Sequence, residues 1–91
     1  MSMSSQVFTI INDKGLHARA SARFVEVVEK FESEVTVEKD GLKASGSSIM
    51  GLLMLAASKG TTIKVTTSGV DSEELTLALD SLIKSKFGED N

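Results

Sequence analysis

Three short stretches of the chain carry the residue pattern of β-strands. VFTII (7–11) is β-branched and aromatic, while EVTVEK (34–39) and TTIKVTT (61–67) alternate valine or isoleucine with polar residues. Such alternation places one face of a strand in the core and the other in solvent. The Asp-Gly pair after EVTVEK favours a tight type I′ turn, so we predict that LKAS (42–45) returns as the second strand of a hairpin.

Three further stretches space their apolar residues as an α-helix does. From Ala18 onward these residues recur at steps of three and four, with charged residues on the opposite side. GSSIMGLLMLAASKG (46–60) has a serine pair before an apolar run and a glycine at its end, which predicts an N-cap, a short helix and a stop. DSEELTLALDSLIKSKF (71–87) begins with Asp71 and Glu74 in a capping-box arrangement. The predicted buried faces of the first and last helices consist of Ala20, Phe24, Val27, Val28 and Phe31, and of Leu75, Ala78, Leu79, Leu82, Ile83 and Phe87.

The order of these elements predicts the fold class. Strand, helix, strand, strand, helix, strand and helix follow one another without a linker or a repeat. Strands with one buried face need helices on that side alone. We therefore expect an α+β fold, an open-faced β-sandwich in which a four-stranded antiparallel sheet carries three helices on one face. The 91 residues suit a single domain, 1–91, with residues 1–5 and 88–91 as flexible ends.

Composition narrows the possible partners. A formal net charge of −3 at pH 7 argues against nucleic acid, whose phosphates attract clustered lysine and arginine. With no cysteine and a single histidine, we expect neither a disulfide nor a metal site, and no other cofactor is implied. No apolar stretch is long enough to span a bilayer, and MSMSSQ at the start has no secretory pattern. We therefore expect a soluble cytoplasmic protein without a membrane partner.

The single histidine lies in the segment NDKGLHARA, where the first helix is predicted to begin. The first turn of a helix presents unpaired backbone N–H groups and the positive end of the helix dipole, so an anion such as phosphate is stabilised there. Arg19 adds a guanidinium that matches phosphate oxygens, and Gly15 allows a tight bend before His17. A neutral imidazole is a nucleophile near pH 7. His17 could thus accept a phosphoryl group held by the backbone of Ala18, Arg19 and Ala20, although these residues alone also fit a histidine that merely ends the loop.

Two motifs resemble those of the HPr family, the phosphocarriers of the bacterial phosphotransferase system. GLHARA (15–20) is similar to the family's histidine motif, Gly-Leu-His-x-Arg-Pro, and SSIMGLLMLAASKG (47–60) is similar to its serine motif. The resemblance covers nearly the whole chain and implies a stoichiometric carrier rather than an enzyme. It implies that His17 accepts a phosphoryl group through Nδ1 from phosphorylated Enzyme I, which obtains it from phosphoenolpyruvate. His17 would then pass the group to a histidine of an EIIA-type protein while Arg19 neutralises charge.

The chain departs from the family pattern in two places. Ala20 stands where the family usually has proline, and proline would preset the backbone of the first helical turn. Glu26 and Glu29 on the first helix, together with the FGED tail (87–90), resemble the nitrogen-related branch of the family, called NPr. The alternative is that these acidic residues are solvated surface charges without a specific role.

Ser48 has two interpretations. Its position before the short helix makes it an N-cap. The resemblance adds regulation, because an HPr kinase/phosphorylase phosphorylates the equivalent serine in many relatives, and Ser47 is the adjacent alternative. A second hypothesis for the whole chain is therefore a non-transferring regulatory module controlled through Ser48. The presence of both His17 and Arg19 favours the carrier over this module and over an unrelated α+β domain.

The short helix is apolar on nearly every side, and a single sheet cannot bury all of it. We predict that Ile49, Met50 and Leu53 stay partly exposed beside the histidine. With Ala18 and Arg19 they would form a docking patch for partner proteins, and methionine suits a surface that accepts several partners. The alternative is that the apolar residues of this helix are all core. We expect the protein to act as a monomer.

Overall fold

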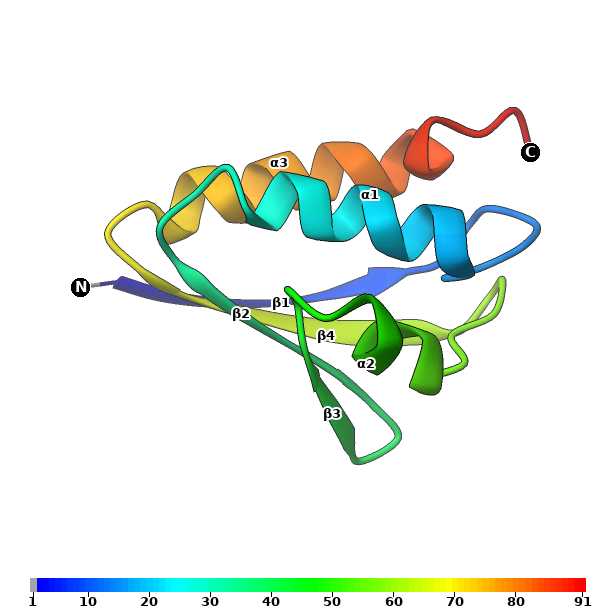
Figure 1. Ribbon diagram of the computed structural model, residues 1–91, viewed down its shortest axis with the longest axis horizontal. Coiled ribbons are helices and arrows are strands. Elements are labelled where there is room, and N and C mark those ends of the chain that lie inside the picture. The colour runs from blue at the N-terminus through cyan, green and yellow to red at the C-terminus, as the bar shows by residue number, and fades with distance from the viewer. Residues whose placement is uncertain (1) are drawn as a thin grey trace.

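Four antiparallel strands form one sheet, and helices cover one of its faces (Figure 1). The computed structural model describes residues 2–91. Its elements are β1 (Ser2–Thr9), α1 (Ala18–Val28), β2 (Glu34–Lys39), β3 (Leu42–Ser45), α2 (Ile49–Met54), β4 (Thr62–Gly69), α3 (Ser72–Lys84) and the 3-10 turn η1 (Lys86–Gly88). The strand order is β1-β4-β2-β3, so β4 and β2 are the central strands. The open-faced α+β sandwich predicted from the sequence is confirmed.

The hairpin of β2 and β3 forms at the residues that the sequence predicts. Asp40 and Gly41 connect the two strands and both have positive φ, of 50° and 83°. A type I′ turn requires positive φ at both central residues, and an Asp-Gly pair tolerates it well. The Asp-Gly turn therefore determines where β2 ends and where β3 begins.

The first strand differs from the prediction, because β1 begins at Ser2 rather than at Val7 and ends at Thr9. It pairs with β4 along its whole length, from Ser2 opposite Gly69 to Thr9 opposite Thr62. The added residues are serines, methionine and glutamine with largely exposed side chains. Backbone pairing with β4, rather than a hydrophobic pattern, places them in the sheet.

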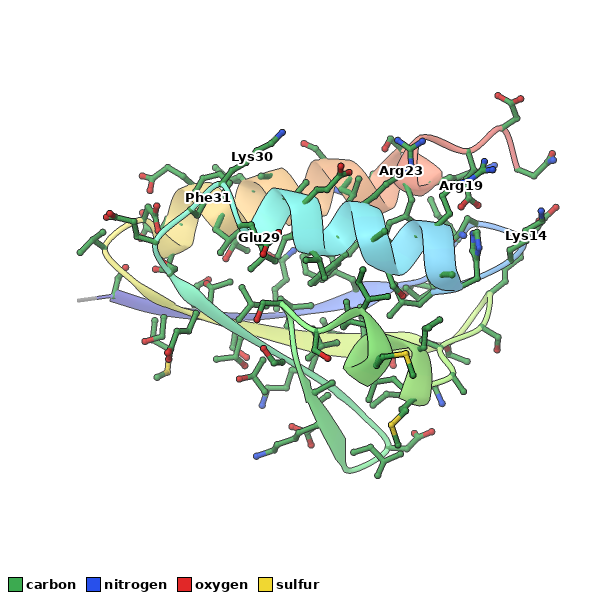
Figure 2. The ribbon with its side chains drawn as sticks, in the orientation of Figure 1. Lys14, Arg19, Arg23, Glu29, Lys30 and Phe31 are labelled. Carbon is green, nitrogen blue, oxygen red and sulfur yellow. The ribbon has the colours of Figure 1, made fainter. Side chains whose placement is uncertain are left out.

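α1 and α3 lie side by side across the sheet and bury their apolar faces against it (Figure 1). Phe24 of α1 and Leu75 and Leu79 of α3 are fully buried. Burial of one such side chain stabilises the fold by about 1.5–3 kcal/mol. Arg23 and Lys30 lie on the exposed side of the α1 segment (Figure 2), as the sequence pattern predicts. Four residues assigned to the buried faces are only half-buried, at the margin of the core: Val27, Phe31, Ala78 and Leu82.

The helices end earlier than the apolar patterns predict. α1 ends at Val28, α2 at Met54 and α3 at Lys84. Beyond α2 the chain leaves the helical conformation, since Ala56 adopts a positive φ of 51°. Within residues 2–91, no helix is both long enough and apolar enough to cross a membrane.

Asp71 is the N-cap residue of α3, but its side chain does not cap the helix. One carboxylate oxygen accepts the Glu32 N–H at 2.9 Å, and the other accepts the Ser33 hydroxyl at 2.5 Å. These hydrogen bonds hold the pKa of the Asp71 carboxyl below its ordinary value, and the bond from Ser33 has the largest effect. The predicted capping box is therefore wrong, because the carboxylate joins the segment between α1 and β2 to the start of α3 instead.

After α3 the chain turns back toward the start of α1. Phe87 adopts a φ of 57° in η1 and is fully buried, so it anchors this turn in the core. The residues beyond it lie at the same end of the molecule as the loop before α1 (Figure 1). There the Asp13 N–H donates to the main-chain oxygen of Asn91 at 3.1 Å. These contacts bring residues 88–91 to the N-terminal end of α1.

Candidate functional site

The loop before α1 is fixed by a close approach of Gly15 to the segment after α2. Gly15 has a φ of 64°, and a Cβ atom on it would collide with the carbonyl oxygen of Ala57. The next residue, Leu16, is buried and donates its N–H to the same oxygen at 2.8 Å. These contacts place His17 at the N-cap of α1, with its side chain 28% exposed. The histidine therefore reaches solvent from a constrained position, at the helix start that the sequence predicts.

The first turn of α1 leaves backbone N–H groups beside this imidazole. The first hydrogen bond within the helix runs from the Ser21 N–H to the His17 carbonyl oxygen, at 2.8 Å. The N–H groups of Ala18, Arg19 and Ala20 consequently have no partner inside the helix. The His17 side chain does not cap them either. Together with the positive end of the helix dipole, they make this helix start suitable for an anion.

His17 and Arg19 share one hollow of about 300 Å³, which also contains Lys14. The cations Arg19 and Lys14 both lie at the end of the molecule where α1 begins (Figure 2). Arg19 is exposed, so its guanidinium can reach an anion at the helix start. Within residues 2–91, no group of three histidine, cysteine or acidic residues is placed to hold a metal ion. The hollow therefore combines the imidazole with two cations, and three acidic residues line it as well: Asp13, Glu89 and Asp90.

Glu89, from the tail after α3, contacts the imidazole directly. Its Oε2 lies 2.5 Å from His17 Nε2, and its Oε1 accepts the Asn12 side-chain N–H at 3.0 Å. Asn12 is fully buried and also donates to the Gly15 carbonyl oxygen at 2.8 Å. The same loop that carries the histidine therefore also holds the carboxylate that contacts it.

The pKa of Glu89 reflects this environment. Burial acts to raise it, but the hydrogen bonds from His17 and Asn12 and the electrostatic influence of His17 and Arg19 outweigh burial. The net result is a pKa below the ordinary value for glutamate, so the side chain is ionised at neutral pH.

The sequence alone indicates His17 and Arg19 but not Glu89 or Asn12. From the sequence, the acidic tail suggests only a likeness to one branch of a family or a solvated charge. A usable signal is nevertheless present, because a phenylalanine and a glycine directly before Glu89 are typical of an anchored turn rather than of a free end.

Ser48 caps α2, as the sequence predicts. Its hydroxyl oxygen accepts the Gly51 N–H at 3.0 Å. Ser48 is half-buried, whereas Ser47 is exposed and lies 2.9 Å from the hydroxyl of Ser45. Neither serine lines the hollow that contains His17 and Arg19. Ser48 thus has a defined structural role separate from the histidine.

One side of α2 presents apolar side chains to solvent. Met50 is 69% exposed and Met54 is 76% exposed, while Ile49 is partly exposed and Leu53 half-buried. We refer to these four residues as the α2 patch. The sequence pattern predicts Ile49, Met50 and Leu53 in such a surface but not Met54, which is the most exposed of the four. The remaining large apolar residues of this segment, Leu52 and Leu55, are buried in the core.

The α2 patch extends to the histidine. Leu53 and His17 line the same shallow hollow of about 260 Å³, together with Lys14. A protein that contacts the imidazole there would also contact Leu53. The structure therefore brings the candidate nucleophile and the α2 patch to one surface.

Comparisons with known proteins agree with this fold. The family model described as "PTS HPr component phosphorylation site" matches residues 4–85. The chain is 51% identical over 87 residues to the phosphocarrier protein HPr of Neisseria meningitidis serogroup A, covering 96% of this chain and 98% of that protein. It is 38% identical over 81 residues to the phosphocarrier protein NPr of Shewanella violacea, covering 89% of each. The crystal structure of HPr-C-His from Thermoanaerobacter tengcongensis matches with a TM-score of 0.92 and 44% identity, over 97% of this chain and 99% of that chain.

The fold and these relatives define the class of the protein as a phosphocarrier. Such a protein holds a phosphoryl group on a histidine and is not itself an enzyme. The chain belongs to the HPr family of the bacterial phosphotransferase system. Its identity to the NPr relative, 38%, is lower than its 51% identity to the Neisseria HPr. The acidic residues that resemble NPr therefore do not place it nearer to that branch.

Proposed function

We propose that His17 accepts a phosphoryl group from phosphorylated Enzyme I and passes it to a histidine of an EIIA-type protein. The family carries its phosphoryl group on a histidine, and this chain contains a single histidine. The observation that carries the proposal is the position of His17 at the start of α1, beside amides without an intrahelical partner. That position offers both a nucleophile and a binding site for the group it receives.

The arrangement supports transfer through Nδ1. Since Nε2 of His17 contacts Glu89, the other ring nitrogen is the one available to a donor. Transfer between two imidazoles requires in-line positioning and stabilisation of the phosphoryl oxygens. The N–H groups of Ala18, Arg19 and Ala20 would bind these oxygens, and the Arg19 guanidinium would offset their charge.

Enzyme I and the EIIA-type protein would both dock on the α2 patch together with Ala18 and Arg19. Each partner must bring its own histidine to His17, and both Ala18 and Arg19 are exposed beside it. Leu53 shares a hollow with His17, so a partner at the imidazole would also cover part of the α2 patch. Methionine side chains adapt to different partner surfaces, which suits a carrier that binds two proteins in turn.

Regulation would act through Ser48. A phosphate added there by an HPr kinase/phosphorylase would place about two negative charges next to Ile49 and Met50. Ser48 directly precedes these residues, and both are exposed. Docking of Enzyme I would weaken, because the apolar contact becomes hydrated and the incoming phosphoryl group is repelled. The alternative, a regulatory module without transfer, needs Ser48 but not a reactive His17.

The test is phosphorylation with Enzyme I and phosphoenolpyruvate. We expect one phosphate per chain, labile in acid and stable in alkali as a phosphoramidate is, and mapping to His17. His17→Ala should abolish this labelling, and Ser48→Ala serves as the matched control that should retain it. An acid-stable adduct, or labelling that survives His17→Ala, would contradict the carrier function.

A further inference from the structure

The tail after α3 brings a carboxylate to Nε2 of His17, the ring nitrogen that does not take part in the proposed phosphoryl transfer. Glu89 Oε2 lies 2.5 Å from Nε2, and the Glu89 side chain is only 11% exposed. We propose that Glu89 is a positioning residue that holds His17 as the Nε2–H tautomer and so keeps the lone pair on Nδ1. This inference rests on the proposed function, in which Nδ1 of His17 is the phosphoryl acceptor.

The Glu89 carboxylate is itself held in place on both oxygens. Its Oε1 accepts a hydrogen bond from Asn12, whose side chain also binds the Gly15 carbonyl oxygen. Asn12 is fully buried, so its side chain has little freedom to turn away. The backbone around Glu89 is held on either side, by buried Phe87 before it and by the hydrogen bond from the Asp13 N–H to the main-chain oxygen of Asn91 after it. The carboxylate is therefore positioned before any partner binds.

The contact decides which nitrogen carries the proton. An ionised carboxylate only accepts hydrogen bonds, so the nitrogen that faces Glu89 must be the donor. Nε2 then bears the hydrogen, and Nδ1 of the neutral ring bears the lone pair. Within residues 2–91, His17 Nδ1 has no hydrogen-bond partner that would favour the other tautomer. The charged hydrogen bond to Glu89 is thus the interaction that selects the reactive form.

The same contact acts after transfer. The Nδ1 lone pair forms the new N–P bond, the P–N bond of the donor histidine breaks, and its electron pair returns to the donor nitrogen. Because the Nε2 proton stays in place, the phosphorylated His17 ring carries a positive charge next to the Glu89 carboxylate. Onward transfer returns the electron pair to Nδ1 and restores the neutral ring. No proton has to move in either direction, so the exchange remains readily reversible.

The first test measures the tautomer directly and needs no partner protein. In ¹⁵N NMR spectra of the unphosphorylated protein at alkaline pH, the Nε2–H form should predominate. Glu89→Ala should lower the ratio of Nε2–H to Nδ1–H by about 10-fold, the effect of losing one charge-assisted hydrogen bond. Glu89→Gln keeps an acceptor oxygen and should retain more of the preference. Asp90→Ala is the matched control, because Asp90 lines the same hollow and its loss removes the same charge.

The second test measures transfer. Phosphorylation of Glu89→Ala by Enzyme I should be slower by about 10-fold, whereas Asp90→Ala should behave as wild type. A wild-type tautomer ratio in Glu89→Ala, or faster phosphorylation of that variant, would overturn the positioning role. If wild-type protein shows the Nε2–H tautomer but takes up no phosphate on His17, the proposed function fails while the tautomer result still holds. Backbone NMR spectra of each variant would confirm that the fold is intact.

Discussion

The Gly15 backbone packs against the Ala57 carbonyl so closely that no side chain fits between them. This contact joins the loop before α1 to the segment after α2, and it fixes the position of His17 at the start of α1. A substitution at Gly15 should therefore affect stability and transfer together.

Gly15→Ala should lower the free energy of unfolding by about 2 kcal/mol or more, because it combines a positive φ with a collision against backbone. Denaturant unfolding measures this change. Gly60→Ala is the matched control, since Gly60 also has a positive φ, of 90°, but a Cβ atom added there would meet no other atom within 4 Å. Equal losses in the two variants would show that φ strain alone, and not the contact with Ala57, determines the cost.

Arg19→Ala should leave the fold intact, because the side chain is exposed, and should slow phosphoryl transfer to His17 by about 10- to 1,000-fold. The reason is the loss of a cation that offsets charge on the transferred group. Rapid-mixing kinetics with phosphorylated Enzyme I measure this rate. Lys30→Ala removes the same charge from the other end of the α1 segment, where the side chain is exposed, and should have little effect. Unchanged kinetics in Arg19→Ala would mean that the helix amides are sufficient.

Ser48→Asp should weaken the affinity of Enzyme I for the protein, with a modest reduction because aspartate carries one charge and phosphoserine nearly two. The effect should shrink at high salt, since exposed charges are screened. The thermal midpoint should change little, because aspartate is itself a good N-cap. Titration calorimetry at two salt concentrations measures the affinity and thermal unfolding measures the midpoint, with Ser47→Asp as a comparison. If the affinity falls only because the protein has unfolded, as a lower thermal midpoint would show, the shared docking surface is contradicted.

Asp71→Asn should destabilise the fold at neutral pH but not in strong acid. The hydrogen bonds from Ser33 and Glu32 hold the folded-state pKa below the ordinary value of 3.8. The ionised carboxylate therefore stabilises the folded state above this pH, and the contribution is lost as pH falls through the folded-state pKa. Unfolding midpoints of wild type and variant should converge on acidification. Midpoints that stay equally far apart in acid would show that the loss does not come from the ionised carboxylate.

How much of the molecule could be predicted depends on how local its determinants are. The sequence predicts the β2–β3 hairpin to the residue, because an Asp-Gly pair defines the turn without help from distant segments. His17 at a helix start followed from its immediate neighbours in the same way. Glu89 could not be assigned, because it meets His17 across 72 positions of sequence and only after Phe87 turns the chain back. The capping box predicted at Asp71 is wrong for a related reason. The Glu32 N–H and the Ser33 hydroxyl, both before β2, bind the carboxylate that a capping box would use.

The strand order has a consequence for synthesis of the chain on the ribosome. β1 is made first, yet its partner strand is β4, so β1 stays unpaired until β4 has emerged. A nascent chain that has reached β4 already exposes His17 but still lacks Glu89. Contacts between segments so far apart form late in folding, because a long loop must close before they are gained. An incomplete chain would therefore present the histidine without the carboxylate that orients it, and the full rate of transfer would be reached only when the two ends of the fold meet.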